Sequence, residues 1–158
     1  GVGFTAEGFD YSTGYARKPD SFDPRAAFIF EGISADEIIG GFGSAGGGAS
    51  GFEIDRADVA YGTPPHALLL ASSEGHSDYY LLVLEDISLN YPGLGGDECD
   101  MVRADLVFFE TPNGGAVFST GSIAWAGSLA HNGYDNNVSR LTENVLRRFL
   151  DSAPFIEV

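Results

Sequence analysis

The chain has 158 residues, of which 44% are apolar and 20% charged, a balance typical of one globular domain rather than a disordered chain. Its 23 acidic residues against 8 lysines and arginines give a net charge of −15. Because such a surface repels phosphate backbones and anionic lipid, we expect neither nucleic acid nor a membrane as a partner. No apolar run reaches the roughly 20 residues of a membrane-spanning helix, and no signal-peptide pattern is visible. We therefore expect a cytoplasmic protein.

The start of the sequence and its single cysteine carry two further expectations. The chain begins at Gly1 and its only methionine is Met101, so we expect a piece of a longer polypeptide. A lone Cys99 excludes an internal disulfide and fits a reducing compartment.

The N-terminal part of the chain divides into two stretches. Residues 1–20 are rich in aromatics and threonine in loose alternation, which predicts an exposed strand or an extended arm. Residues 21–158 are expected to form an α/β core. Near its beginning, Asp23 suits a helix N-cap and Pro24 suits the first helical position, so a short helix is predicted there.

Two sequence patterns known from enzymes are out of their usual context here. Residues 41–46, GFGSAG, match the G-x-G-x-x-G of dinucleotide sites, but that motif has to follow a strand and open a helix. In this chain a strand-like stretch follows it and no lysine supports a phosphate, so a turned loop is predicted instead of a nucleotide site. Ser73 and Ser122 lie outside any Gly-x-Ser-x-Gly elbow, which leaves a hydrolase triad without support.

The segment 52–58, FEIDRAD, alternates like a strand. One face would carry two carboxylates, Glu53 and Asp55, while the other would be apolar apart from Arg56. Two carboxylates on one side of a strand could share a metal or divide acid and base roles. The alternative is a solvated edge strand in which Arg56 pairs with Asp55 or Asp58.

Three nearly continuous apolar runs, at 66–72, 79–84 and 105–110, are typical of strands buried on both faces. A sheet of that kind needs a covering layer on each side. Since the chain offers one long helix, we expect a partner segment to cover the second face. The alternative is that the strands are less buried than their composition indicates.

The C-terminal part contains the clearest local signals. Asn113-Gly114 favours a tight turn between two strands, which predicts a hairpin. A helix with caps at 135–137 is predicted next, and Glu143 precedes Arg147 by four residues on its surface. Its apolar face would consist of Val138, Leu141, Val145 and Phe149.

Neither His66 nor His76 belongs to a spacing that indicates a metal site. His76 lies between Glu74 and Asp78, which could act as ligands with it if the turn folds back. A polar loop is the favoured interpretation.

Several segments together resemble a known family: PDSFDPRAAFIFEGI, GFEIDRAD, GTPPHALLLASSEGH and the run from GGAVFST to RRFL. They are similar to the C-terminal region of the large (beta) subunit of N,N-dimethylformamidase and of its bacterial relatives, from about Tyr15 to Leu150. In that family the region completes a domain similar to glutamine amidotransferases. The resemblance therefore implies an α/β fold, with part of a flavodoxin-like sheet, a hairpin and one long C-terminal helix.

The resemblance also implies an activity, the hydrolysis of a small N-substituted formamide to formate and an amine. The family enzyme depends on iron held by two tyrosines and a glutamate, and we expect those ligands outside this chain. Glu53 matches a further catalytic carboxylate, with the role of general base or of positioning water. Asp55, Arg56, His66 and His76 are secondary candidates, and no residue here is expected to bind a metal or cofactor by itself.

The expected partners follow from the same resemblance. They are the rest of the parent polypeptide, further copies of the protein in a homo-oligomer, and a small subunit. The alternative to an enzyme part is a packing or oligomerisation module with an amidotransferase-like fold, because fold similarity does not transfer activity.

Overall fold

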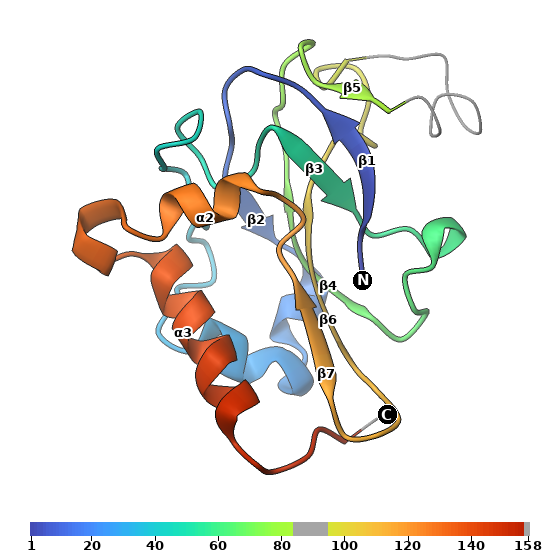
Figure 1. Cartoon of the computed structure of the whole chain (residues 1–158), viewed down its shortest axis with the longest axis vertical. Coiled ribbons are helices and arrows are strands. Elements are labelled where there is room, and N and C mark those ends of the chain that lie inside the picture. The colour runs from blue at the N-terminus through green and yellow to red at the C-terminus, as the bar shows by residue number, and fades with distance from the viewer. Residues whose placement is uncertain (84–94, 157–158) are drawn as a thin grey trace.

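The computed structural model describes residues 1–83 and 95–156, and it shows a mixed α/β arrangement with two antiparallel sheets (Figure 1). The smaller sheet has the order β3 (Glu53–Arg56), β1 (Gly3–Glu7) and β5 (Leu81–Leu82). The larger sheet has the order β2 (Tyr15–Arg17), β4 (Leu68–Ser73), β6 (Asp105–Glu110) and β7 (Ala116–Ser119).

The helical elements lie mainly beside the larger sheet (Figure 1). They are α2 (Ala124–Ser128), α3 (Asn137–Leu150) and the 3₁₀ helices Pro19–Phe22, Pro24–Phe30, Val59–Tyr61 and His131–Tyr134. Asn144 joins α3 to the end of Pro24–Phe30 by donating to two backbone carbonyls, those of Ile29 and Glu31. Within the described residues, no helix combines the length and the apolar character needed to cross a membrane.

The helix caps and the surface ion pair that the sequence predicts are present in the structure. The side chain of Asn136 caps α3 by accepting a hydrogen bond from the Ser139 amide at 2.9 Å. Glu143 and Arg147 form the expected surface ion pair. The helix predicted after Asp23 is a 3₁₀ helix, and the Asp23 carboxylate caps it by accepting from the Arg25 amide. The long C-terminal helix and its cap are thus confirmed.

The hairpin is also confirmed, and so are the buried strands expected at 66–72 and 105–110. The run 79–84 is not buried on both faces, since Tyr79 is 75% and Leu81 46% exposed. β6 and β7 pair in register on either side of a turn in which Gly114 has a φ of 78°. All six residues of β6 are buried within this chain, so the expectation that an outside segment must cover this strand is wrong. Helical elements cover one face, where Phe108 packs against Phe28, and loop residues cover the other. Of the run 79–84, only Leu81–Leu82 forms a strand, and position 84 lies outside the described residues.

Of the two alternatives expected for the first 20 residues, strands are present and an extended arm is not. β1 lies in the middle of the smaller sheet, between β3 and β5, and β2 lies at one edge of the larger sheet. Tyr15 in β2 is fully buried, and its hydroxyl donates to the carbonyl of Thr120 at 2.7 Å. The aromatic residues that indicated an exposed strand therefore belong partly to the core.

The expected flavodoxin-like, amidotransferase-like sheet is not confirmed. A flavodoxin-like sheet consists of parallel strands joined by helical crossovers. The strand pairings within the described residues are antiparallel, for which short turns such as the one between β6 and β7 suffice. The broader expectation of a mixed α/β fold with a hairpin and a C-terminal helix does hold.

Candidate functional site

β3 places its two carboxylates on one face, as the alternation predicted. Ile54 is fully buried, and so is nearly all of Arg56, because both side chains point into the protein. Glu53 is exposed and Asp55 is half-buried on the opposite face. In the antiparallel register Glu53 lies directly opposite Glu7 of β1. The face therefore presents several acids close together.

The two carboxylates of β3 have different environments. Burial, and then the negative charge of Glu53, raise the pKa of Asp55 above its ordinary value. The Oδ1 atom of Asp55 is buried and has no hydrogen-bond partner within the part of the chain that the structure describes. Asp55 therefore retains its proton to a higher pH than an ordinary aspartate does. Such a carboxyl group beside the exposed Glu53 can divide acid and base roles with it.

Arg56 supports the strand from the other side. Its guanidinium pairs with Asp58 at 3.0 Å, which is one of the two partners that the sequence indicated. It also lies 5.6 Å from the centre of the Tyr61 ring. Since Arg56 is 2% exposed, its contacts stabilise the fold and do not face a substrate.

The glycine-rich stretch before β3 packs against the segment at 12–13. The backbones of Thr13 and Ser50 exchange two hydrogen bonds, and a Cβ atom at Gly51 would overlap the Oγ of Ser12. A Cβ at Gly48 would overlap the Thr13 carbonyl. Residues 44–47 form turns, bends lie on either side of them and no helix begins within 41–49, so the prediction of a turned loop is confirmed. The glycines allow close backbone approach.

Two side chains that no sequence pattern indicated hold the turn that leads into Glu53. Ser122 hydrogen-bonds to both backbone groups of Gly51, each at 2.8 Å. The hydroxyl of Tyr80 accepts a hydrogen bond from the Phe52 amide at 3.2 Å. Both partners come from distant parts of the chain, so the local sequence contained no signal for them.

His76 lies in a loop with polar neighbours, as expected, but its side chain is buried. It is 1% exposed, and its Nε2 lies 2.8 Å from the Oγ of Ser73 and 3.3 Å from that of Ser50. The ring packs against Tyr80, while Nδ1 has no hydrogen-bond partner among the described residues. Burial lowers the pKa of His76 to about 4, so the imidazole is neutral at physiological pH. Within the described residues, His76, Glu74 and Asp78 do not form a group that could hold a metal ion.

Acidification should destabilise the protein through His76. Its folded-state pKa of about 4 lies below the ordinary value of 6.5, so the unfolded chain binds the proton more tightly and stability falls as the pH falls between these values. We expect a loss of about 2 kcal/mol between pH 7 and pH 5 from this group. Urea unfolding of wild type and of His76→Gln at both pH values measures it. An equally steep loss in the variant would contradict the assignment to His76.

His66 lies far from Glu53, beside the end of β6. Its Nε2 is 3.1 Å from the carbonyl oxygen of Glu110, and its ring meets Phe109 edge-on. The neighbouring Arg25 forms a bidentate ion pair with the Glu110 carboxylate, which lowers the pKa of Glu110. His66 therefore belongs to a structural cluster, and the structure does not bring it together with the acids of β3.

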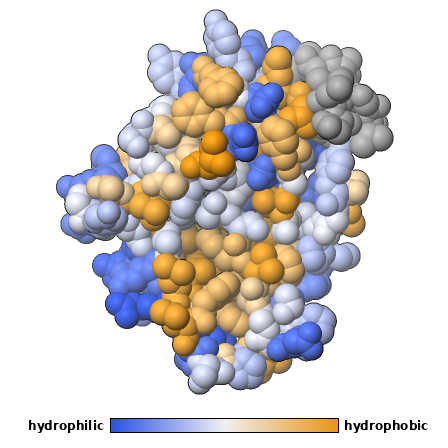
Figure 2. All heavy atoms as spheres, viewed as in Figure 1, coloured by the Kyte–Doolittle hydropathy of each residue, from blue (hydrophilic) through white to orange (hydrophobic). Residues whose placement is uncertain are grey.

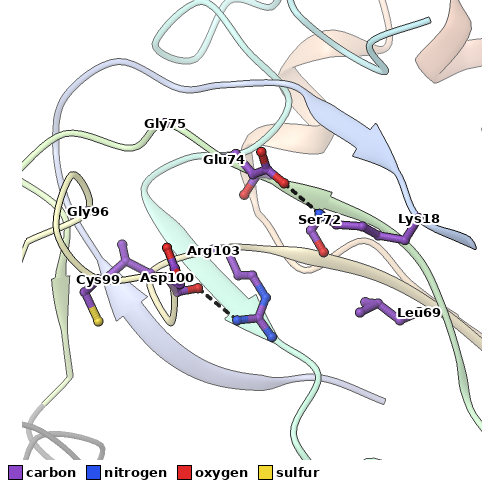
Figure 3. A pocket seen from close by; sticks show the side chains of 11 residues that line it. Lys18, Leu69, Ser72, Glu74, Gly75, Gly96, Cys99, Asp100 and Arg103 are labelled. Carbon is purple, nitrogen blue, oxygen red and sulfur yellow. Dashed lines mark hydrogen bonds and ion pairs between the residues drawn. The ribbon is translucent and has the colours of Figure 1, made fainter. Parts of the chain in front are cut away.

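A pocket of about 490 Å³ lies between β4 and residues 96–103 (Figure 3). Its basic side chains pair with groups of the protein itself. Lys18 contacts Glu74 at 2.6 Å, and Arg103 donates to the Asp100 carbonyl and contacts Asp105. The basic side chains that line this pocket are therefore already engaged by the protein itself.

The described residues do not gather a set of metal ligands. Among residues 1–83 and 95–156, no group of three histidine, cysteine, aspartate or glutamate side chains could hold a metal ion. The carboxylates of β3 are therefore without further ligands in this part of the chain.

Comparison with known proteins gives the context of the site. A family model described as N,N-dimethylformamidase beta subunit-like, C-terminal, matches residues 1–136. The N,N-dimethylformamidase beta subunit of Paracoccus aminophilus is 53% identical over 154 residues, and that of an Alcaligenes species is 51% identical. Each alignment covers 98% of this chain but 20% of the relative, so the chain spans about a fifth of their length. The chain therefore belongs to the N,N-dimethylformamidase beta subunit-like, C-terminal family.

Proposed function

We propose that these residues form the C-terminal part of an amide hydrolase that converts a small N-substituted formamide to formate and an amine. The observation that supports this best is the identity of 53% to an N,N-dimethylformamidase beta subunit across nearly the whole chain. In this proposal the rest of the amidotransferase-like domain is supplied by the remainder of a longer polypeptide.

Glu53 is the proposed general base. It is exposed, it follows a turn held from several sides, and its neighbour Asp55 lies on the same face. The Glu53 carboxylate would take a proton from water as the water oxygen bonds to the formyl carbon. As the C–N bond breaks, the proton passes to the amine nitrogen, so the products are formic acid, which ionises, and the free amine. A residue in this role is most effective when its carboxylate can reach the water directly.

The resemblance implies iron, and among the described residues no group of three histidine, cysteine, aspartate or glutamate side chains could hold it. We therefore propose that two tyrosines and a glutamate outside this chain hold the iron and that Glu53 lies near it. No step assigned to Glu53 depends on the metal.

Exposed apolar residues favour a second role as a packing or oligomerisation module. Figure 2 shows apolar residues gathered on one face of the molecule. Phe9 near β1 is 85% exposed and Leu150 at the end of α3 is 86% exposed. Surfaces of this kind mark interaction sites. The proposed partners are the rest of the polypeptide, further copies of the protein and a small subunit.

Assaying the full-length protein with N,N-dimethylformamide distinguishes the two roles. An amide hydrolase should release formate and dimethylamine in equal amounts, whereas a packing module should release neither. Light scattering on the same sample would measure its assembly. A stable, assembled protein without formate release would contradict the hydrolase proposal.

A further inference from the structure

We propose that Ser122 is a positioning residue for Glu53. Its hydroxyl holds the turn 50–52, and the conformation of this turn sets the direction in which the Glu53 side chain leaves the backbone. The inference rests on the proposed function of Glu53, and it adds a residue that acts through the backbone and does not touch the substrate.

The Ser122 hydroxyl makes three hydrogen bonds, and two of them are to the backbone of one residue, Gly51. Its Oγ accepts from the amide of Gly51 and donates to the carbonyl of the same residue, both at 2.8 Å. It also accepts from the amide of Ala124, at the start of α2, at 3.1 Å. A hydroxyl has one donor and two acceptor positions, so this one is fully used. A single side chain thus joins both backbone groups of Gly51 to α2.

The residue that follows Gly51 shows why such a support is needed. Phe52 has a φ of +64°, a left-handed conformation that a side chain other than glycine adopts only when its surroundings enforce it. The Phe52 amide is held by Tyr80, and its carbonyl accepts from the Gly8 amide at 2.9 Å. Glu53 comes next, so a change in the dihedral angles of Phe52 would swing the carboxylate away from its position.

The other end of the turn is fixed independently of Ser122. Ser50 exchanges two backbone hydrogen bonds with Thr13, and its Oγ lies 3.3 Å from Nε2 of His76. Removing the Ser122 hydroxyl should therefore loosen Gly51, the residue that leads into Phe52, without unfolding the whole loop. Ser122 is half-buried, so losing one oxygen atom leaves little empty volume.

The test compares Ser122→Ala and Ser122→Thr in the full-length protein. Ser122→Ala should lower kcat roughly tenfold with KM within about twofold of wild type, because a displaced base slows the chemical step more than binding. Ser122→Thr retains the hydroxyl and should restore kcat. Deuterium exchange of a peptide spanning 50–52 should be faster in Ser122→Ala alone.

Ser21→Ala is the matched control for stability. Ser21 is a buried serine in the 3₁₀ helix Pro19–Phe22 whose Oγ donates to the Lys18 carbonyl at 2.7 Å, away from the turn. Its variant should melt at about the same temperature as Ser122→Ala, while kcat and the exchange at 50–52 stay at wild-type values.

Two results would overturn the inference. One is exchange at 50–52 that does not respond to Ser122→Ala, and the other is faster exchange with unchanged kcat in an active protein. If the proposed function is wrong, the wild-type protein itself should release no formate, which distinguishes that outcome from the two above. In that case the exchange measurement still decides whether the hydroxyl holds the turn, with unchanged exchange counting against it.

Discussion

Replacing Glu53 with glutamine in the full-length protein should lower kcat at least a hundredfold, because a glutamine amide cannot accept the proton of the attacking water. General bases typically contribute a factor of this size. Glutamine has nearly the same shape, and Glu53 is exposed, so folding should be unaffected. The measurement is formate release at saturating substrate, together with the melting temperature and the iron content of the variant.

Glu7→Gln is the control that distinguishes the loss of a catalytic base from the loss of a negative charge. Glu7 is also exposed and lies opposite Glu53 in the register of β1 and β3, so its variant loses the same charge from the same face. Wild-type kcat in Glu7→Gln beside a strong loss in Glu53→Gln would support the proposed base. If Glu53→Gln hydrolyses the formamide at the wild-type rate with its metal content unchanged, β3 has only a structural role and another group is the base.

The parts of the fold that the sequence predicts well depend on neighbouring residues. α3 needs a cap at Asn136 and an apolar face with helical spacing, and the β6–β7 hairpin needs a glycine with positive φ at its turn. The order of the strands depends on contacts between distant segments. The composition of β1 indicates a strand, as expected, but nothing in it indicates that this strand lies between β3 and β5.

The candidate site likewise has some features that neighbouring residues predict and others that depend on distant segments. Alternation alone places Glu53 and Asp55 on one face of β3, since side chains on a strand alternate. The amide of Phe52, which has a left-handed conformation, is held by a tyrosine, and the preceding Gly51 is held by a serine, both far along the chain. His76 is a loop residue whose polar neighbours suggest solvent, but its side chain is buried beside the nearby Ser73 and the distant Ser50. Such contacts cannot be inferred from one sequence without its structure.

Gly121→Ala should destabilise the protein by about 4 kcal/mol, through backbone strain and overpacking together. Gly121 has a φ of +66°, and a Cβ there would lie 2.7 Å from the carbonyl oxygens of Asp105 and Asp55. Its own carbonyl accepts from the Asp55 amide at 2.8 Å. Because these atoms are backbone of β6 and β3, no side chain can move aside, and the two sheets would have to separate slightly. Urea unfolding at pH 7 measures the loss.

Gly133→Ala distinguishes crowding from dihedral strain. Gly133 has nearly the same φ, +64°, but a Cβ there would meet nothing within 4 Å. Its variant should lose only about 1 kcal/mol, the lower end of the cost of a left-handed conformation. The difference between the variants then measures how tightly β3 is held against β6. Equal losses would show that the junction beside Asp55 yields easily, and a junction that yields could not keep the neighbouring Glu53 in a fixed position.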